Sequence, residues 1–218
     1  MELLPADLDR VLGRRDVVVV DGPDAQTYLH SQVSQDLNGM TVGEQRWTFV
    51  LDPTGKVESL ARVTRVGDER FELDTDEGFG EALLARIDRF KIRVKADTSI
   101  GEQSGTPADE HARVAMGWPR LGAELVPGES LAAGTGLSGV AVSYTKGCYP
   151  GQELVERMDS RGAKAPKALR RVPAPAGAVP GGPVMVDGVE VGTYTSVAAD
   201  LALAWVKRNS DIGEHIQF

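Results

Sequence analysis

Two alternating segments joined by a short turn constrain the fold of this chain more than any other feature. In residues 46–52 and 56–65, apolar side chains recur at alternate positions, the spacing that places them on one face of a strand. The joining residues 52–55 read DPTG, and a type I turn favours aspartate, proline and glycine in this order. The sequence therefore predicts a β-hairpin, followed by a third strand at residues 70–74.

The remainder of the first 165 residues mixes helical and strand periodicity. Strand patterns are expected at residues 17–20, 91–97 and 140–144, and helical patterns at residues 25–33 and 80–90. An antiparallel meander interspersed with helices indicates an α+β fold rather than a doubly wound parallel sheet.

The sequence changes character after about residue 165. Short strand-like runs at residues 169–172, 183–186, 189–197 and 201–208 are separated by segments rich in proline and glycine. Closely spaced short strands with such turns are typical of a small β-barrel or sandwich. We therefore predict a first domain over residues 1–165 and a C-terminal β-barrel domain over residues 166–218.

The composition limits the class of protein and its location. The net charge is −8 and the isoelectric point is about 5.0, so general binding to nucleic acid or to an anionic membrane is not expected. A single cysteine cannot form an internal disulfide, which favours a reducing compartment. The start of the chain turns acidic too soon for a signal peptide, and no apolar run reaches the roughly 20 residues that span a bilayer. These features predict a cytoplasmic protein.

Three motif matches lack the context that their functions need. Residues 134–139 read GTGLSG, but the expected strand follows this segment, whereas a dinucleotide fingerprint precedes a helix. Residues 143–146 match S-x-x-K without the accompanying motifs of β-lactamases. His30, His111 and His215 lack the spacing of a zinc site, so no metal site is predicted.

Residues 146–157, KGCYPGQELVER, contain the one cysteine of the chain. We expect a strand to end before Lys146, a tight turn at Gly147, and a helix to begin after Pro150. A thiol at a helix N-terminus beside a lysine has a lowered pKa, so Cys148 is predicted to be a functional, accessible thiol. The alternative is a buried packing residue, since free cysteine is often buried.

This stretch resembles the signature of the YgfZ-type folate-binding proteins, relatives of the aminomethyltransferase (T-protein) of the glycine cleavage system. The matching residues are Lys146, Gly147, Cys148, Tyr149, Gly151, Gln152 and Glu153. Residues 20–37, 51–63, 86–97, 161–172, 192–196 and 201–208 are similar to other segments of the family, so the resemblance covers most of the chain.

The resemblance implies a tetrahydrofolate-binding accessory protein that supports assembly or repair of iron–sulfur clusters in client enzymes, including tRNA-modifying enzymes. It implies a ring-like α+β fold around a folate-sized hole, closed by a C-terminal β-barrel. Cys148 would be the functional thiol. Folate would contact the same stretch and its flank, through Lys146, Gly147, Tyr149, Gly151, Gln152, Glu153, Arg157 and Arg161. The expected partners are folate and iron–sulfur client or assembly proteins.

Two other functions remain open. One is folate-dependent aminomethyl transfer, as in the T-protein, and the other is an interaction protein that has lost folate binding. The T-proteins carry an acidic pair after the hairpin glycine, one acid being catalytic, whereas this chain has Glu58 followed by Ser59. Ala115 stands where the family has a folate-contacting glutamate. The chain is thus expected to bind folate without transferring an aminomethyl group.

The chain also departs from the family in length and charge. The connector at residues 98–111 replaces a longer subdomain, which leaves the channel either more open or completed by a second subunit in a homodimer. A basic cluster is either a solvated surface or an anion site for the folate tail or an acidic partner: Arg157, Arg161, Lys164, Lys167, Arg170 and Arg171. The aromatic residues that either fill the core or stack on a pterin are Tyr28, Trp47, Phe49, Trp118 and Tyr144.

Overall fold

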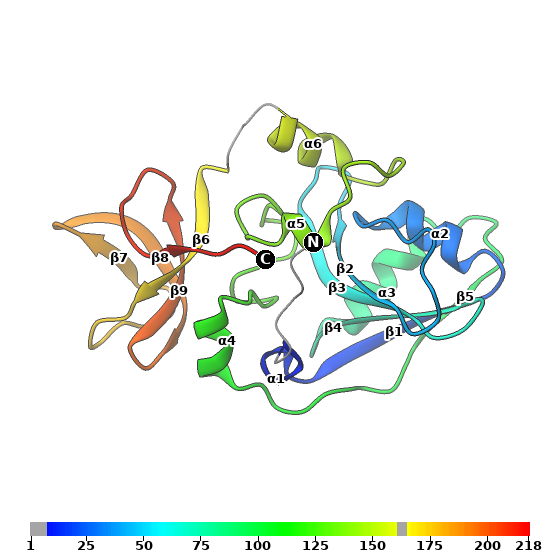
Figure 1. The fold of residues 1–218 in the computed structure, drawn as a ribbon, viewed down its shortest axis with the longest axis horizontal. Coiled ribbons are helices and arrows are strands. Elements are labelled where there is room, and N and C mark those ends of the chain that lie inside the picture. Colours follow the sequence, from blue (N-terminus) through cyan, green and yellow to red (C-terminus); the bar gives the residue numbers. More distant parts are fainter. Residues whose placement is uncertain (1–7, 161–164) are drawn as a thin grey trace.

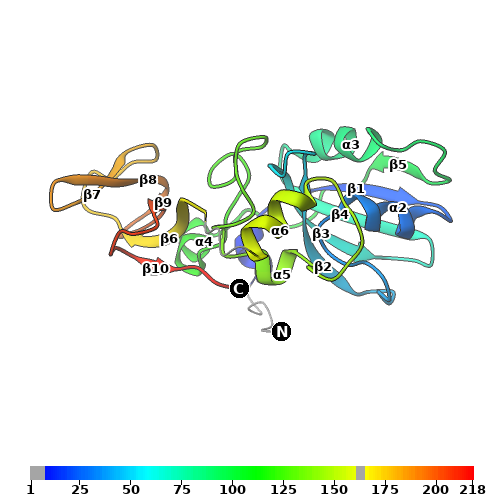
Figure 2. The ribbon, with the colours of Figure 1, turned by 90° about the horizontal axis from the view of Figure 1, so that it is seen from above.

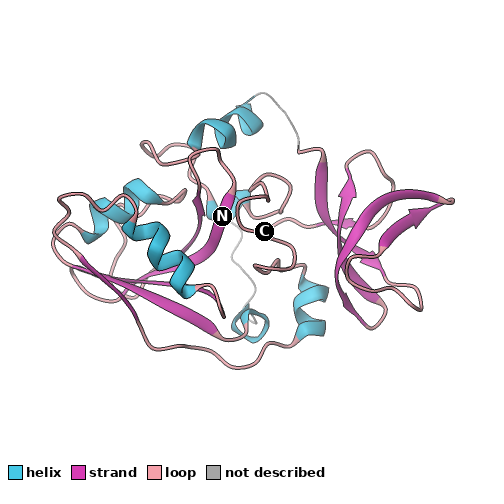
Figure 3. Cartoon of the chain, turned by 180° about the vertical axis from the view of Figure 1, so that it is seen from behind, coloured by secondary structure: helices cyan, strands magenta, loops and turns pink. Residues whose placement is uncertain are grey.

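The computed structural model describes residues 8–160 and 165–218. Within these residues the strands form two five-stranded antiparallel sheets, which lie toward opposite ends of the molecule with helices and loops between them (Figures 1 and 3). This arrangement confirms the α+β class.

The N-terminal sheet has the strand order β2-β3-β4-β1-β5. Its strands are β1 (Arg15–Asp21), β2 (Gln45–Leu51), β3 (Val57–Arg65), β4 (Arg70–Asp76) and β5 (Asp97–Ile100). The predicted hairpin is confirmed as β2 and β3, and the predicted third strand as β4. In the hairpin turn, the Asp52 carboxylate accepts hydrogen bonds from the backbone N–H groups of Thr54 and Lys56, at 2.8 and 2.9 Å. The aspartate of DPTG therefore fixes the turn through its side chain.

Two helices cover one face of this sheet. They are α2 (Ala25–Gln32) and α3 (Gly80–Asp88), and their apolar side chains pack with those of the strands in one core cluster. Asp16 accepts hydrogen bonds from the N–H groups of Gly78 and Gly80, which would otherwise be unpaired at the start of α3. Partial burial acts to raise the pKa of Asp16, but bonds from Gln103 and from these N–H groups lower it below its usual value.

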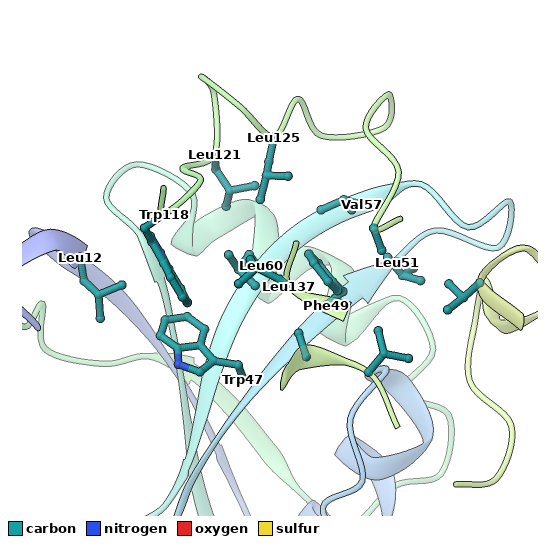
Figure 4. Close-up of a cluster of buried hydrophobic side chains, with 14 of the residues drawn as sticks. Leu12, Trp47, Phe49, Leu51, Val57, Leu60, Trp118, Leu121, Leu125 and Leu137 are labelled. Carbon is teal, nitrogen blue, oxygen red and sulfur yellow. The ribbon is translucent and has the colours of Figure 1, made fainter. Parts of the chain in front are cut away.

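The opposite face of the sheet packs against the middle of the chain. The second core cluster joins β2 and β3 to α1 (Leu8–Leu12), α5 (Ser138–Ala141) and the loop at residues 118–132. Figure 4 shows these side chains converging from several segments on the strands.

The C-terminal sheet has the order β10-β6-β9-β8-β7. Its strands are β6 (Lys167–Pro173), β7 (Pro183–Val186), β8 (Val189–Ala198), β9 (Leu201–Lys207) and β10 (Glu214–His215). In the part of the chain that the structure describes, β7 and β10 form the two edges and do not pair with each other, so these strands form no closed barrel. The boundary at residues 165 and 166 stays a prediction.

Two expected strands are wrong. Residues 138–141 form the helix α5, with extended backbone only from Val142. Residues 91–96 form a loop, and the strand begins at Asp97. In a strand over residues 91–97 the alternation would place Ile92 on the buried face, whereas 77% of its surface is exposed. Alternation over so few residues did not discriminate, because it also fits a single helical turn, as in α5, and a partly exposed loop, as in residues 91–96.

The helix α4 (Glu110–Met116) connects the two sheets, packing on α1 and on β8 and β9. Its Arg113 donates hydrogen bonds to Glu124 and Ser196, at 2.9 and 2.6 Å, and Ser196 lies on β8. Glu124 is fully buried and also accepts a hydrogen bond from Ser196, at 2.6 Å. A buried ionic network thus links the middle of the chain to the C-terminal sheet.

Candidate functional site

Cys148 lies in the loop between α5 and α6 (Gln152–Ser160), and its side chain is exposed. The neighbouring Gly147 is also exposed, and an added Cβ there would meet no heavy atom within 4 Å. The predicted accessibility of the thiol is therefore confirmed, and a buried packing role for Cys148 is wrong.

Lys146 points into the protein. Its ammonium group donates hydrogen bonds to the backbone carbonyls of His30, Val33 (2.5 Å) and Gln35 (3.2 Å), at and just beyond the C-terminus of α2. The His30 carbonyl lies in the last turn of α2, at the negative end of the helix dipole, which favours a cation there. Burial lowers the pKa of Lys146 to about 8. Lys146 thus holds the Cys148 loop on α2. Its ammonium group is directed at these carbonyls and not at the Cys148 thiol.

Tyr149 and Gly151 hold the other side of the loop. The Tyr149 ring is buried with its centroid 5.0 Å from the Lys146 ammonium nitrogen, and burial raises the pKa of the Tyr149 hydroxyl. Gly151 has φ +82°, and an added Cβ would lie 2.6 Å from the Asp52 carbonyl oxygen and 2.9 Å from the Gly55 Cα. The loop is therefore packed directly on the turn of the β2–β3 hairpin.

The remaining predicted site residues lie on the first turns of α6. Glu153 and Arg157 are exposed and form a salt bridge with each other, while Gln152 donates a hydrogen bond to Glu156. Arg161 lies outside the described residues. The predicted set therefore divides in two: Lys146, Tyr149 and Gly151 are directed inward, whereas Gly147, Cys148, Glu153 and Arg157 face solvent.

The basic cluster does not form one surface in the described residues. Arg170 is buried and donates to the carbonyls of Arg208, Ser210 and Ile212, at 2.7 to 2.8 Å. Arg171 binds the Ala115 carbonyl and the Glu214 carboxylate. These two arginines hold the C-terminal segment, so an anion site that includes them is wrong. Lys164, like Arg161, lies outside the described residues.

The glycine-rich motif at residues 134–139 leads into α5, which begins at Ser138, so the predicted strand after the motif is wrong. Gly134 and Gly136 have φ values of +92° and +83°. Added Cβ atoms would lie 2.7 Å from the Lys167 carbonyl oxygen and 2.4 Å from that of Ile216. The glycines therefore allow the loop to pack against β6 and the C-terminal segment.

The tertiary structure assembles a second group of polar residues that the sequence did not indicate. On the face of the N-terminal sheet opposite α2 and α3, Arg15 bonds to Asp74 at 2.8 Å and also pairs with Asp76. Arg62 bonds to the other oxygen of Asp74, at 2.8 Å. We call the set of Arg15, Trp47, Arg62, Asp74 and Asp76 the polar strip. These five residues come from the four strands β1 to β4, so only the strand pairing places them together.

Trp47 joins the polar strip to an aromatic cluster. The guanidinium groups of Arg15 and Arg62 lie 5.7 and 5.8 Å from its ring centroid. The Trp118 ring lies 4.6 Å from Trp47 at an interplanar angle of 60°, and Phe218 packs edge-on against Trp118 (Figure 4 shows the two tryptophans). Trp118 is 1% exposed, and its indole N–H has no hydrogen-bond partner in the described part of the chain.

Two pockets flank the polar strip. One has a volume of 710 Å³ and is lined by Asp76, Arg14 and Arg120, among others. The other has a volume of 640 Å³ and is lined by Arg15 and Arg62, among others. They share Leu12, Gly13 and Pro107 as walls. Burial raises the pKa of Asp76, although the charge of Arg15 acts to lower it. A buried acid with a shifted pKa beside a pocket is a typical feature of a functional site.

Glu58 and Ser59, the two hairpin positions that differ from the T-protein pattern, form contacts with other side chains of the fold. The Glu58 carboxylate lies 2.7 Å from Nε of Arg86, in a salt bridge. Ser59 is buried and shares a hydrogen bond of 2.8 Å with Thr75. The hairpin therefore has no unpaired carboxylate at these two positions, because Glu58 is paired with Arg86 and Ser59 has a hydroxyl group.

A sequence signal for the polar strip existed in β4. Asp74 and Asp76 occupy alternate positions of a strand and are both buried. Charged residues at alternate positions normally mark the solvent face of a strand, so this pattern by itself does not predict burial. Nothing in the sequence near Arg15 indicated that it would cover them. Among the described residues, no group of three or more metal-ligating side chains comes together.

Of the comparisons with known proteins, the one with solved structures shows the fold. No family model matches the chain. An uncharacterized protein of Haemophilus influenzae is 26% identical over 193 residues, covering 70% of this chain and 69% of its own length. The crystal structure of the glycine cleavage system aminomethyltransferase T from Bartonella henselae matches with a TM-score of 0.77. At 13% identity, this match covers 97% of the chain and 87% of the Bartonella protein.

The chain therefore has the α+β fold of the glycine cleavage T-protein over nearly its whole length. The described helices include none long and apolar enough to cross a membrane.

Proposed function

We propose that the protein binds tetrahydrofolate and acts as an accessory protein for iron–sulfur enzymes. The T-protein fold supports folate as the ligand, and the observation that carries the proposal is the polar strip with its 710 Å³ pocket. This volume lies within the roughly 300–1,000 Å³ of small-molecule sites.

The residues of the pocket fit a reduced folate. A carboxylate can accept hydrogen bonds from the ring N–H and the amino group of a pterin. Asp76 is a carboxylate in the pocket wall whose oxygens already accept from Arg15 and from the Leu121 N–H, so a pterin would use the remaining lone pairs. Arg14 and Arg120 also line the pocket, where they pair with Glu77 at 3.8 Å and Glu110 at 3.3 Å, and in this proposal they exchange these partners for the carboxylates of a glutamate tail. In this proposal Asp76 supplies the acidic contact that Ala115 cannot. When bound, tetrahydrofolate would supply a carrier for one-carbon groups.

Calorimetry with tetrahydrofolate tests the proposal. We expect Asp76→Asn to weaken binding by about 10-fold or more, because a hydrogen bond to a charged group contributes about 1.5–3 kcal/mol. Asp21→Asn is the matched control. Asp21 is an exposed residue at the C-terminal end of β1, away from the pocket, and pairs with Arg70. Arg120→Ala provides a second test should Asp76→Asn not fold. If calorimetry detects no heat of binding at millimolar folate, the result would support the alternative that the protein is an interaction protein that has lost folate binding.

One-carbon transfer is the second candidate function. It is favoured by Asp76, since burial raises the pKa of this carboxyl toward the range useful for proton transfer. It is disfavoured at the hairpin, where Arg86 neutralises Glu58 and Ser59 is bonded to Thr75. We expect no methylenetetrahydrofolate from an aminomethylated carrier protein. Formation of methylenetetrahydrofolate would show that the protein is a one-carbon transfer enzyme.

A further inference from the structure

The loop between α3 and β5 is a basic segment on an acidic protein. Residues 89–95 contain four cations, Arg89, Lys91, Arg93 and Lys95, whereas the whole chain has a net charge of −8. Figures 1 and 2 place α3 and β5 at the end of the molecule far from the C-terminal sheet.

The same loop presents apolar side chains to solvent. Ile92 is 77% exposed, more than any other large apolar side chain in residues 8–160 and 165–218. Phe90, two residues earlier, is also exposed. Exposed large apolar residues surrounded by polar groups often mark a surface for another molecule.

The loop is held in a defined shape. At its base, the Lys95 N–H donates to the Asp24 carboxylate at 2.8 Å, and the Asp24 N–H donates to the Lys95 carbonyl at 3.2 Å. The Arg86 guanidinium lies 4.9 Å from the centre of the Phe90 ring. Arg93 has φ +58°, a left-handed conformation that costs a non-glycine residue about 1–3 kcal/mol. The loop is therefore already ordered before a partner binds. Binding at Ile92 would then cost little additional conformational entropy.

The four cations of the loop differ in their salt-bridge partners. Lys91 lies 3.3 Å from Asp88, and Arg89 lies 4.0 Å from Glu58. In the described ranges, neither Arg93 nor Lys95 forms a salt bridge. Their charges are therefore available to a partner.

We propose that residues 89–95 form a docking surface for an acidic segment of another protein, with an apolar side chain of that segment packed on Ile92. Charge complementarity selects the partner: the four cations of the loop attract an acidic segment at close range and fix its register. The net charge of −8 repels a second copy of this chain and an extended anionic surface such as a bilayer, whereas a short acidic segment can contact the loop alone. The proposal is independent of folate binding.

Fluorescence anisotropy with a labelled synthetic peptide of glutamates with interspersed leucines tests this surface. We expect the peptide to bind the wild-type protein, with affinity that falls as salt rises. We expect Arg93→Glu and Ile92→Ser each to weaken binding about 10-fold or more. Lys207→Glu is the matched control, because it makes the same charge change on β9, and it should bind like the wild type. Peptides with lysine for glutamate, or glycine for leucine, should bind at least 10-fold more weakly.

Several results would overturn the proposal. Equal binding of the peptide to the wild type and to Arg93→Glu would remove the loop as the docking surface. Sedimentation with phosphatidylserine vesicles that depends on Arg93 would assign the loop to membranes. A dimer in analytical ultracentrifugation that Ile92→Ser dissociates would assign it to self-association. Thermal melts establish that each variant is folded, and tetrahydrofolate calorimetry on the same variants reports separately on the folate site.

Discussion

Neighbouring residues of the KGCYPGQE stretch have separate tasks. Lys146 and Tyr149 are buried, and Lys146 binds three carbonyls at the end of α2. Cys148 between them is exposed. The thiol is thus exposed in a loop that Lys146 and Tyr149 anchor to the protein, which suits a functional role better than a packing role.

Cys148→Ser should therefore separate function from folding. The exposed side chain makes little contribution to the core, so we expect the thermal midpoint to stay close to that of the wild type. Iodoacetamide should alkylate Cys148 in the native protein, and the variant should fail to restore iron–sulfur enzyme activities in a strain that lacks the protein. Full restoration by the variant would show that the thiol is dispensable.

At the scale of elements, the Cys148 loop depends on the hairpin beneath it. Neither Gly55 in the β2–β3 turn nor Gly151 in the loop has room for a Cβ: at Gly55 it would lie 2.6 Å from the Leu154 Cβ of α6, and at Gly151 it would lie 2.6 Å from the Asp52 carbonyl oxygen. Both also have positive φ values, +86° and +82°. The loop and the turn thus require glycine from two distant parts of the sequence.

Gly151→Ala should destabilise the protein by more than about 1 kcal/mol, since it adds a collision with the Asp52 carbonyl to an unfavourable φ. Gly147→Ala is the matched control four residues away, because a Cβ there meets nothing within 4 Å. It should change the free energy of unfolding by less than about 0.5 kcal/mol. Urea denaturation measures both, and similar values for the two variants would refute the packing of the loop on the turn.

At the scale of the whole molecule, the network of Arg113, Glu124 and Ser196 joins the middle of the chain to the C-terminal sheet. Both oxygens of Glu124 are hydrogen-bonded, with Arg120 donating its backbone N–H at 3.0 Å. A buried charge network of this kind fixes one arrangement of its parts, because an unpaired buried charge is costly.

Glu124→Ala should lower the free energy of unfolding by about 3–5 kcal/mol, the usual cost of removing one partner from a buried ion pair. Glu129→Ala, an exposed position in the same loop, should have little effect. Guanidinium denaturation followed by tryptophan fluorescence is a suitable measurement, since the Trp205 indole donates to the Glu124 carbonyl at 2.8 Å. A small change for Glu124→Ala would mean that the network does not secure the sheet.

The sequence by itself determined the α+β class, the β2–β3 hairpin, α3, α6 and the exposed cysteine. In each case local chemistry was sufficient: a turn with its required residues, a helical repeat, or a glycine that leaves open space. The sequence could not determine the loop at residues 91–96 or the helix α5, because alternation over a few residues does not report which side is covered.

Only the tertiary structure decided the polar strip and the role of Lys146. Arg15, Arg62 and Asp74 are far apart in the sequence, and strand order alone places them on one face. Lys146 lies beside Cys148 in the sequence, yet its ammonium group binds carbonyls more than 110 residues away along the chain. A long, flexible side chain is directed by whichever acceptors the fold leaves unpaired near it, and these acceptors are set by packing rather than by the neighbouring sequence.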